Sequence, residues 1–366
     1  MSNAYSTCDS LVRAACGPNV RNMSSTYGNC YNLTVAVCGD KVVDFTKTYA
    51  NCNSLTYAAC GDSVTEMDHT YFNCVSLTNA ACGNNVKTMN RTYYNCALIT
   101  KAVCGPNVTD MLDTYTNCRN ISAPVCGANV INMIGTFNGC NNSTSFNTPV
   151  CGANVVDMSK AYYYCHYLTS AVCGANVTNM YNTYASCYNI KNAVCGTKVV
   201  NMSGTYSSCY NIWNAVCGSN VTDMSYAYYY CSNMRNAVCG PNVTNMAYAY
   251  YGCTLLGTAV CGNNVVNMAY AFYNCSNNSY LSSAKCGPNV TNMAYAYYNC
   301  NYITVPNVGE KVEDISYAYY NCGKITTPRC PNSVLEMGSA YANCKNIKTA
   351  ACGENVVNMP YAYNGC

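Results

Sequence analysis

The sequence predicts a repeat solenoid, in which a parallel β column runs along one side and short helical or 3₁₀ turns lie on the other. Two observations predict this fold. An aromatic-x-x-Cys motif recurs every 22 residues, and the residues between its copies follow one pattern along the whole chain. A unit this short cannot bury its apolar residues alone, so each unit must stack on copies of itself.

The repeat reads C-x-x-L-x-x-A-x-C-G-x-N-V-x-x-M-x-x-A/T-Y-x-x, and its first Cys is called the closing Cys because it ends the previous repeat. About sixteen such repeats fill residues 1–366, without a linker or a charge run between them. We therefore expect one solenoid and no domain boundary. Two steps of 25 residues place three-residue insertions near 141–146 and 276–281, which we expect to bulge beside the strand face.

Each part of the repeat predicts one local structure. The segment L-x-x-A-x-C is short, roughly alternating and stopped by Gly, which is typical of one short strand per coil, stacked in parallel on the next. Gly-x-Asn is expected to turn the chain, because both residues tolerate positive φ. The spacings of three and four in Val-x-x-Met-x-x-Ala-Tyr fit one helical or 3₁₀ turn. A tandem array of helix hairpins is the alternative, but 22 residues leave too little chain for two helices.

Four columns of residues are predicted to line the interior. Val lies ten residues before the closing Cys in every complete repeat, and Met lies seven before it except at Phe45 and Ile315. Tyr, or Phe in two coils, lies three before it. The closing Cys is the fourth column. A second Cys column follows the strand, and Val308 replaces Cys there in one coil.

The 32 Cys allow three interpretations. Buried reduced thiols are favoured, because free Cys packs as a small hydrophobic residue and because Val308 shows that one Cys is dispensable. Disulfides between adjacent coils, or across one coil as from Cys8 to Cys16, stay open. Metal ligation is disfavoured, because the Cys lie 8 and 14 residues apart and because His69 and His166 lie in different coils. We predict no metal and no cofactor.

Composition excludes several function classes. A net charge of +3 offers no basic field for nucleic acid. No stretch approaches the roughly 18 apolar residues of a membrane span, so we expect no membrane insertion. The sequence has no nucleophile–base constellation, no phosphate-binding loop and no G-x-G-x-x-G, so we predict no catalytic residues and a protein that is not an enzyme.

A tyrosine stripe is the candidate contact surface. Tyr occurs five residues and two residues before the closing Cys in five successive coils, on either side of the core Tyr. If the core Tyr points inward, these flanking rings point outward or sideways, on the convex side. Exposed aromatic clusters tend to mark contact surfaces for protein or sugar partners, although the rings could also stack only to cover the core edge. The ten residues are Tyr226, Tyr229, Tyr248, Tyr251, Tyr270, Tyr273, Tyr295, Tyr298, Tyr317 and Tyr320.

The frame of Cys, Leu, two strand positions, a turn, Val, Met and Ala-Tyr-x-x-Cys is similar to the BspA-like leucine-rich repeats. Residues 242–253 and 289–300, which read Asn-Val-Thr-Asn-Met-(x)₃-Tyr-x-x-Cys, resemble the Met-rich surface-protein variant of that family, here also rich in Cys. The resemblance implies a leucine-rich-repeat-like solenoid and a non-enzymatic role in surface recognition or adhesion, on a cell surface or a phage virion. The family usually has Ile at the second strand position and Phe as the aromatic, where this chain has Cys and Tyr.

The ends of the repeat array suggest a second function. Met1 and Cys366 occupy ordinary repeat positions, so no polar cap is visible, although terminal coils normally need one. Open edges invite pairing, so we expect end-capping by another chain or head-to-tail stacking of copies into a filament. Residues 1–5 lack the basic and apolar regions of a secretory signal, which favours a virion protein or another export route over conventional secretion.

Overall fold

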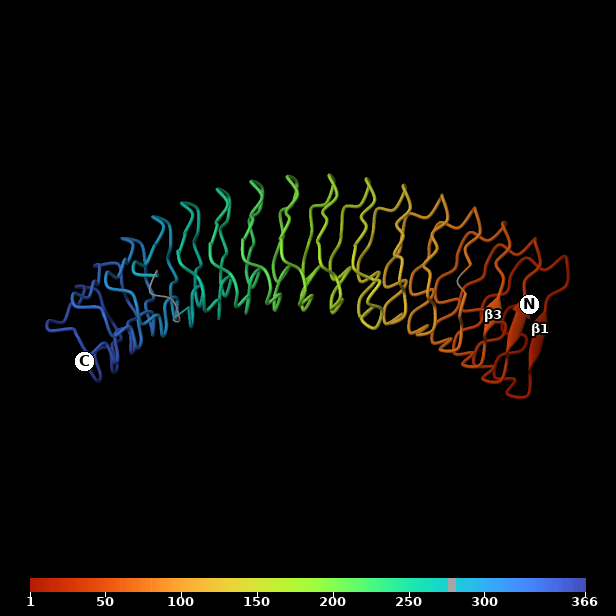
Figure 1. The fold of residues 1–366 in the computed structure, drawn as a ribbon, viewed down its shortest axis with the longest axis horizontal. Coiled ribbons are helices and arrows are strands. Elements are labelled where there is room, and N and C mark those ends of the chain that lie inside the picture. Colours follow the sequence, from red (N-terminus) through yellow and green to blue (C-terminus); the bar gives the residue numbers. More distant parts are fainter. Residues whose placement is uncertain (80, 276–280) are drawn as a thin grey trace. The chain divides into compact units, whose positions relative to one another are not determined.

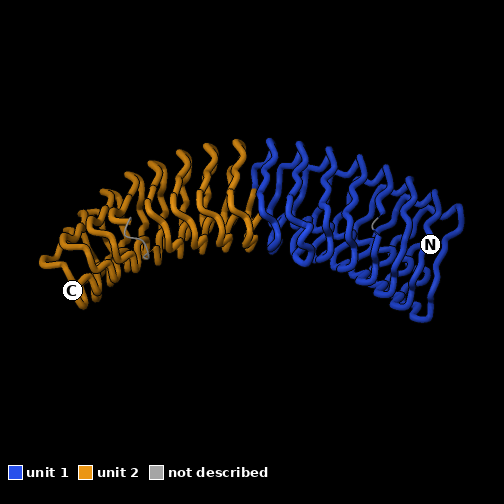
Figure 2. The backbone as a smooth tube through the Cα atoms, in the orientation of Figure 1, with its two compact units in different colours: residues 1–179 blue, residues 180–366 orange. Residues whose placement is uncertain are grey.

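The computed structural model describes residues 1–79, 81–275 and 281–366, and it divides into two compact units, Met1–Asn179 and Met180–Cys366 (Figure 2). Within each unit the chain winds through successive coils, each lying against the next (Figure 1). The predicted repeat solenoid is therefore confirmed within each unit. One continuous solenoid over 1–366 stays a prediction.

Among the described residues, the predicted parallel strands form fully only in the first three coils of unit 1. β1 (Arg13–Ala15), β2 (Val35–Val37) and β3 (Tyr57–Ala58) form one sheet in the order β1-β2-β3. The strands run parallel, and Ala14 of β1 lies opposite Ala36 of β2. The Ala of each strand is buried while its neighbours are half-buried or exposed, so a small side chain lets the sheet lie close over the core.

In later coils the strand is reduced to single parallel bridges at the same repeat position, such as Asn214 with Asn236 in unit 2. A second column of bridges lies eight residues before the closing Cys in both units. Its side chains also join neighbouring coils, because the amide of Asn22 donates to the carboxylate of Asp44 at 2.9 Å. Two β columns therefore hold each coil to the next.

The predicted helical or 3₁₀ turn is wrong, because none of the described residues forms a helix. Over residues 23–30 the chain forms successive β-turns, and its amides alternate between two directions. The Thr26 amide donates to the Met23 carbonyl of its own coil, whereas the Tyr27 amide donates to the Thr48 carbonyl of the next coil, both at 2.9 Å. Every second amide is thus committed to the neighbouring coil, and the i→i−4 bonds of a helix cannot form.

The expected positive φ at Gly-x-Asn is also wrong. The left-handed residues lie five and one before the closing Cys instead, as at Ser25 (φ 53°) and Asn29 (φ 60°). Asn suits the second of these positions, because it tolerates this backbone better than most residues. There the amides also form a ladder, in which Asn51 donates to Asn29 at 2.8 Å.

Close packing between coils explains Gly-x-Asn. A Cβ added at Gly218 would lie 2.8 Å from the carbonyl oxygen of Gly196 in the preceding coil, so only glycine fits without a shift. The Asn220 side chain donates to the Thr197 carbonyl of that coil at 2.8 Å. Both residues of the motif therefore serve contacts between coils.

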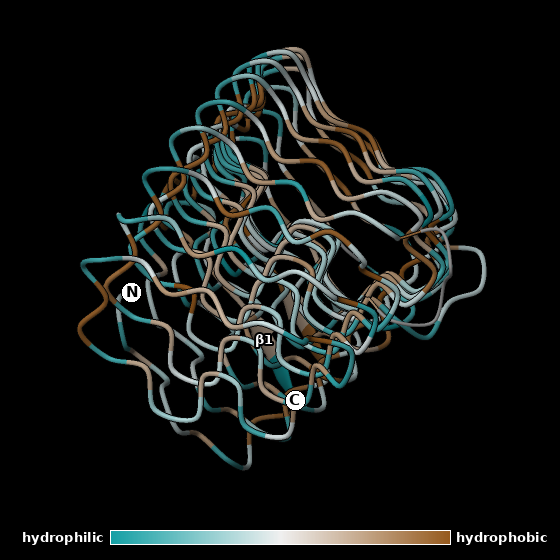
Figure 3. Ribbon diagram, turned by 90° about the vertical axis from the view of Figure 1, so that its left-hand side faces the viewer, coloured by the Kyte–Doolittle hydropathy of each residue, from teal (hydrophilic) through white to brown (hydrophobic). Residues whose placement is uncertain are grey.

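The predicted core columns are confirmed. Val243, Met246, Tyr250 and Cys253 of one coil are all fully buried, and residues of similar hydropathy recur at the same place in successive coils of each unit (Figure 3). The Cys253 thiol donates to the Tyr228 carbonyl of the preceding coil at 3.1 Å. The closing Cys thus fills space and satisfies a buried carbonyl, and all 32 cysteines are unbridged.

The insertion near 141–146 forms a turn whose Ser145 is exposed, and Phe146 occupies the place of the repeat's Leu in the core. The ring of Phe146 lies 5.8 Å from that of Phe137 and 6.2 Å from that of Tyr162. The core columns on both sides keep their register. The second insertion, near 276–281, lies outside the described residues except for Leu281, which is buried.

The hydroxyls of the core Tyr column bond to the strand side of their own coil. Tyr250 donates to the Val238 carbonyl at 2.5 Å and accepts the Val238 amide at 3.0 Å. In the coil that carries β2 the equivalent residue is Val37, which lies within the sheet, and the buried Tyr49 hydroxyl has no hydrogen-bond partner. The tyrosine hydroxyl therefore bonds this backbone in coils where the sheet is reduced to single bridges, and also at the first strand, where Tyr27 donates to the Ala15 carbonyl at 3.2 Å, but not beside β2.

This difference predicts that replacing the core Tyr by Phe changes the free energy of unfolding differently in the two coils. Tyr250→Phe would leave the Val238 amide and carbonyl without their partner, so we expect a loss of about 1–3 kcal/mol in the free energy of unfolding. Tyr49→Phe removes a buried hydroxyl that has no partner, so we expect it to be neutral or stabilising. Urea denaturation of both variants measures the free energies. Equal destabilisation by the two substitutions would contradict the proposed role of the hydroxyl.

Candidate functional site

The structure brings the ten tyrosines of the predicted stripe together on unit 2 as two adjacent columns, which we call the tyrosine ladder. In the column that starts at Tyr226 and ends at Tyr317, successive ring centroids lie 4.4–4.6 Å apart and the rings are within 7° of parallel. In the column from Tyr229 to Tyr320 the spacing is 4.5–4.9 Å. The two columns lie 5.6–6.0 Å apart within a coil, so each ring contacts rings of both columns.

The ladder lies at the surface. Tyr226 is exposed and the other nine rings are half-buried, whereas the core Tyr228 between the columns is fully buried. Since the rings stack along the column, their faces are covered by one another. The ladder therefore presents ring edges and hydroxyls to the solvent.

The ladder is uncharged at neutral pH. Partial burial, followed by the neighbouring hydroxyls of Tyr248 and Tyr295, raises the pKa of Tyr270 to about 12. Partial burial and the neighbouring tyrosines also raise the pKa of Tyr226 and Tyr298. The surface is a row of neutral phenols that can donate and accept hydrogen bonds.

One column of the ladder carries a backbone cost. Tyr248, Tyr270 and Tyr295 have φ of 57–58°, in the left-handed region. This conformation costs a residue with a Cβ roughly 1–2 kcal/mol, and Tyr has no special tolerance for it. Asn182 occupies the same repeat position in the same unit with φ 51°, so a residue better suited to this backbone fits there. The tyrosines are thus not explained by backbone preference.

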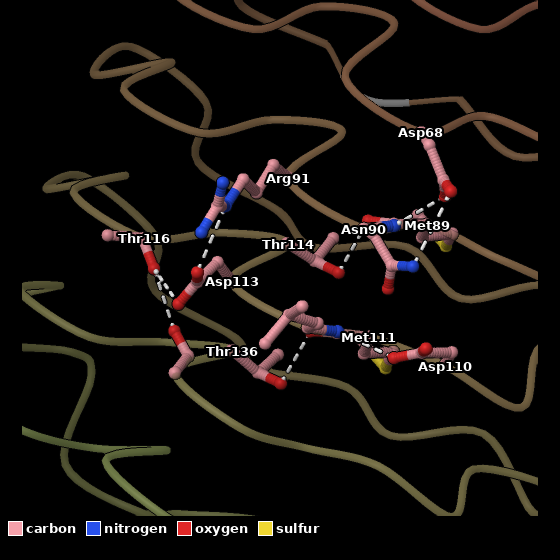
Figure 4. A network of polar contacts seen from close by, with 12 residues as sticks. Asp68, Met89, Asn90, Arg91, Asp110, Met111, Asp113, Thr114, Thr116 and Thr136 are labelled. Atoms are coloured by element: carbon pink, nitrogen blue, oxygen red, sulfur yellow. Dashed lines mark hydrogen bonds and ion pairs between the residues drawn. The ribbon is translucent and has the colours of Figure 1, made fainter.

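A polar cleft of about 380 Å³ lies in unit 1 at the equivalent repeat positions. Arg91 leans over Asp113, and its Nε donates to a carboxylate oxygen at 3.2 Å (Figure 4). The other carboxylate oxygen lies 3.4 Å from the Thr116 hydroxyl. The residues that line the cleft are Phe72, Arg91, Tyr94, Asp113, Thr116, Asn138 and Lys160.

Buried threonines anchor the coils beneath this cleft. Thr114 donates to the Met89 carbonyl at 2.8 Å and Thr136 to the Met111 carbonyl at 2.9 Å, each reaching back to the preceding coil (Figure 4). Both threonines are fully buried. The backbone that carries the cleft residues is therefore held by side chains as well as by the β columns.

Sequence analysis missed this cleft, although a signal was present. Lys47, His69, Arg91, Asp113 and Lys160 occupy one repeat position, in a chain whose charged residues make up only 9%. A column of charge in so neutral a sequence distinguishes this face of unit 1. Burial, followed by the charges of Arg91 and Lys47, lowers the pKa of His69.

Neither metal ligation nor membrane insertion has a structural candidate. Among residues 1–79, 81–275 and 281–366, no three His, Cys, Asp or Glu side chains form a group that could hold a metal ion. Within the same ranges, no helix is long and apolar enough to span a bilayer.

Comparison with known families identifies the repeat. The BspA type leucine rich repeat region, in its six-copy form, matches residues 20–144, 113–235, 158–279 and 268–366. The chain belongs to the BspA-type leucine-rich repeat family. The repeats of this family are leucine-rich repeats, and they build a repeat scaffold here.

Solved structures of leucine-rich repeat proteins resemble this chain. A leucine-rich repeat protein from Bacteroides ovatus is 16% identical to this BspA-type chain. The match covers 92% of this chain and 86% of the Bacteroides protein, and the TM-score is 0.63. A leucine rich cell surface protein from Faecalibacterium prausnitzii is also 16% identical, with coverages of 90% and 88% and a TM-score of 0.49. The first likeness confirms the leucine-rich-repeat fold alone. No curated protein matches this BspA-type chain.

The departures of this BspA-type chain from the family pattern have structural reasons. Tyr in place of Phe adds a hydroxyl that bonds the strand backbone, as Tyr250 does at Val238. Cys in the second column contacts the Met of its own coil, with Cys126 Sγ 3.5 Å from Met133 Sδ, and its sulfur packs beneath the glycine of the next coil. Both substitutions therefore support the packing of the coils.

Proposed function

We propose that this chain is a non-enzymatic recognition scaffold, displayed on a cell surface or a virion, and that the tyrosine ladder is its contact surface for a protein partner. The observation that supports it is the run of ten stacked, mostly half-buried tyrosines, in which successive rings of each column lie 4.4–4.9 Å apart. The left-handed backbone at the first column belongs to the repeat, since Ser25 and Lys47 share it, whereas the unbroken run of tyrosines does not. Stacking offsets part of the cost, but it does not require Tyr at a position where Asn182 also fits.

A protein partner suits this surface better than a sugar. Sugars stack on the faces of aromatic rings, and within the ladder those faces are covered by the neighbouring rings at 4.4–4.9 Å. Ring edges and hydroxyls remain, and these make the mixed apolar and hydrogen-bonded contacts common in protein interfaces. Tyr also loses little side-chain entropy on binding, the more so where stacking already orders it.

Replacing Tyr248 and Tyr270 together by Asn tests this proposal. Asn suits the left-handed backbone, so we expect the fold to be kept and binding to fall at least tenfold, since exposed aromatic anchors carry much of an interface's affinity. The full chain would be screened against arrayed extracellular-matrix proteins and arrayed glycans, and the variant measured on each hit.

The matched control is Tyr57→Asn, which removes an exposed tyrosine of unit 1 far from the ladder in sequence. Binding that the ladder variant leaves unchanged would overturn the ladder as the contact surface. Hits confined to glycans would overturn the choice of a protein partner.

Head-to-tail assembly into filaments stays the alternative prediction for this chain. Negative-stain images of concentrated protein distinguish the two functions. Fibres of regular width would favour a structural filament, and separate particles would favour the recognition scaffold.

A further inference from the structure

The polar cleft of unit 1 is a gap in two side-chain columns. Two residues before the closing Cys, the column runs from Phe72 and Tyr94 to Thr116 and Asn138, so large rings give way to small polar side chains. Five residues before it, Gly135 interrupts the charged column. The cleft of about 380 Å³ is lined by residues of both columns, and the carboxylate of Asp113 lies where a Cβ of residue 135 would be.

One wall of the cleft is an aromatic face. The rings of Phe72 and Tyr94 stack at 5.0 Å and within 15° of parallel. The opposite face of Tyr94 therefore looks along the column toward the coil that carries Thr116, where no ring covers it. This differs from the tyrosine ladder, in which ring succeeds ring, and it leaves an aromatic face for an apolar surface of a ligand.

The polar walls carry a net positive charge. Arg91 uses Nε for Asp113, and its two terminal nitrogens make no hydrogen bond to the part of the chain that the structure describes. The pair with Arg91 compensates the charge of Asp113, and Lys160 adds a second cation at the cleft. The side-chain amide of Asn138 supplies both a donor and an acceptor there.

We infer that this cleft binds an acidic sugar unit, a pyranose ring that carries a carboxylate. The free edge of a guanidinium matches a carboxylate with two parallel hydrogen bonds, which Lys160 strengthens by its charge. The apolar face of a sugar ring fits the uncovered face of Tyr94, and its hydroxyls meet the carboxylate of Asp113 and the amide of Asn138. An anion without such a ring would leave the aromatic wall unused. The inference stands apart from the tyrosine ladder, which lies in the other unit.

Binding of a galacturonate trisaccharide to the full chain tests this inference by calorimetry. The neutral galactose trisaccharide is expected to bind at least tenfold more weakly, because it lacks the carboxylate. Arg91→Gln is expected to lower galacturonate affinity about tenfold or more, whereas Arg119→Gln, which removes an exposed arginine of the same unit outside the cleft, leaves it unchanged.

A second variant closes the cleft without removing a charge. Thr116→Tyr places a ring where Tyr229, Tyr251 and Tyr273 show that this repeat position accepts one. We expect it to stack on Tyr94 and to abolish galacturonate binding, with the circular dichroism spectrum unchanged. Equal affinity for the neutral and acidic trisaccharides, equal affinity for a poly-glutamate peptide, or full binding by both the Arg91 and Thr116 variants would each overturn the inference.

Discussion

A reduced sample taken from about pH 8 to about pH 10 is expected to unfold, because its buried thiols cannot ionise while the chain is folded. Burial, as the largest cause, raises the pKa of the closing cysteines, to about 12 for Cys52, Cys300 and Cys344. In the unfolded chain a thiol ionises near its ordinary pKa of 9.0. The stability that these thiols contribute is therefore fully present below pH 9 and is lost as the pH rises toward 12.

The number of thiols makes the effect large. Each thiol with a strongly raised pKa lowers the free energy of unfolding by about 1.4 kcal/mol at pH 10. Cys52, Cys300 and Cys344 together account for about 4 kcal/mol, a large part of the stability of an ordinary domain, and burial raises the pKa of further closing cysteines, such as Cys74 and Cys253, in the same direction. Circular dichroism against pH, with return to neutral pH to check reversibility, measures the transition.

Removing thiols gives the matched control. Val308 is buried at a position of the second Cys column, so Cys217→Val, Cys239→Val and Cys261→Val have a precedent within the chain. Burial is the main cause of the raised pKa at all three cysteines. Together the substitutions should reduce the loss of stability per pH unit above pH 9, by about 1.4 kcal/mol for each of Cys217 and Cys261, where burial raises the pKa to about 12. A fold that persists to about pH 11 would contradict the thiol account.

Adding one methyl group to the glycine column should also have a large effect. The Cβ of Gly218→Ala would lie 2.8 Å from the Gly196 carbonyl oxygen and 3.0 Å from Cys195 Sγ. The carbonyl belongs to the backbone of the coil beneath and cannot rotate away, so the two coils must separate. We expect a loss of about 1–3 kcal/mol in the free energy of unfolding, measured in urea.

Gly323 is the matched control, because a Cβ added there meets no atom within 4 Å and its φ lies outside the left-handed region. Gly323→Ala should be neutral or stabilise the protein by about 0.4–1 kcal/mol, since alanine restricts the unfolded chain. If Gly218→Ala and Gly323→Ala destabilise the protein equally, the repeat needs glycine for its backbone flexibility and not for close packing between coils.

The core columns could be predicted because the buried positions recur with the period of the sequence repeat. Val243, Met246 and Tyr250 lie where the period places them. The turn was not predictable, since spacings of three and four suit a helical turn and stacked β-turns equally. The left-handed positions carry Lys47, Arg91 and Tyr248, whose residue types give no hint of positive φ.

The two candidate surfaces differed in how far they could be predicted from the sequence. The tyrosine ladder was visible as a run of identical residues at fixed positions, and the structure adds its stacking and its backbone cost. The polar cleft depends on what is small or missing, at Thr116 and Gly135, between larger neighbours. Such a gap becomes a site only when the coils are aligned in space, because its walls come from residues far apart in the chain.

The hydrogen bonds of a coil go to its own residues or to the coil next to it, as those of Cys253 with Tyr228 and of Asn220 with Thr197 do. Loss or duplication of one full period inside a unit would therefore join equivalent backbone and leave all other coils unchanged. Unequal recombination between copies of the repeat can thus lengthen or shorten such a molecule without changing the fold of its other coils. The length of the molecule can therefore vary by inheritance while the stability of each coil stays the same.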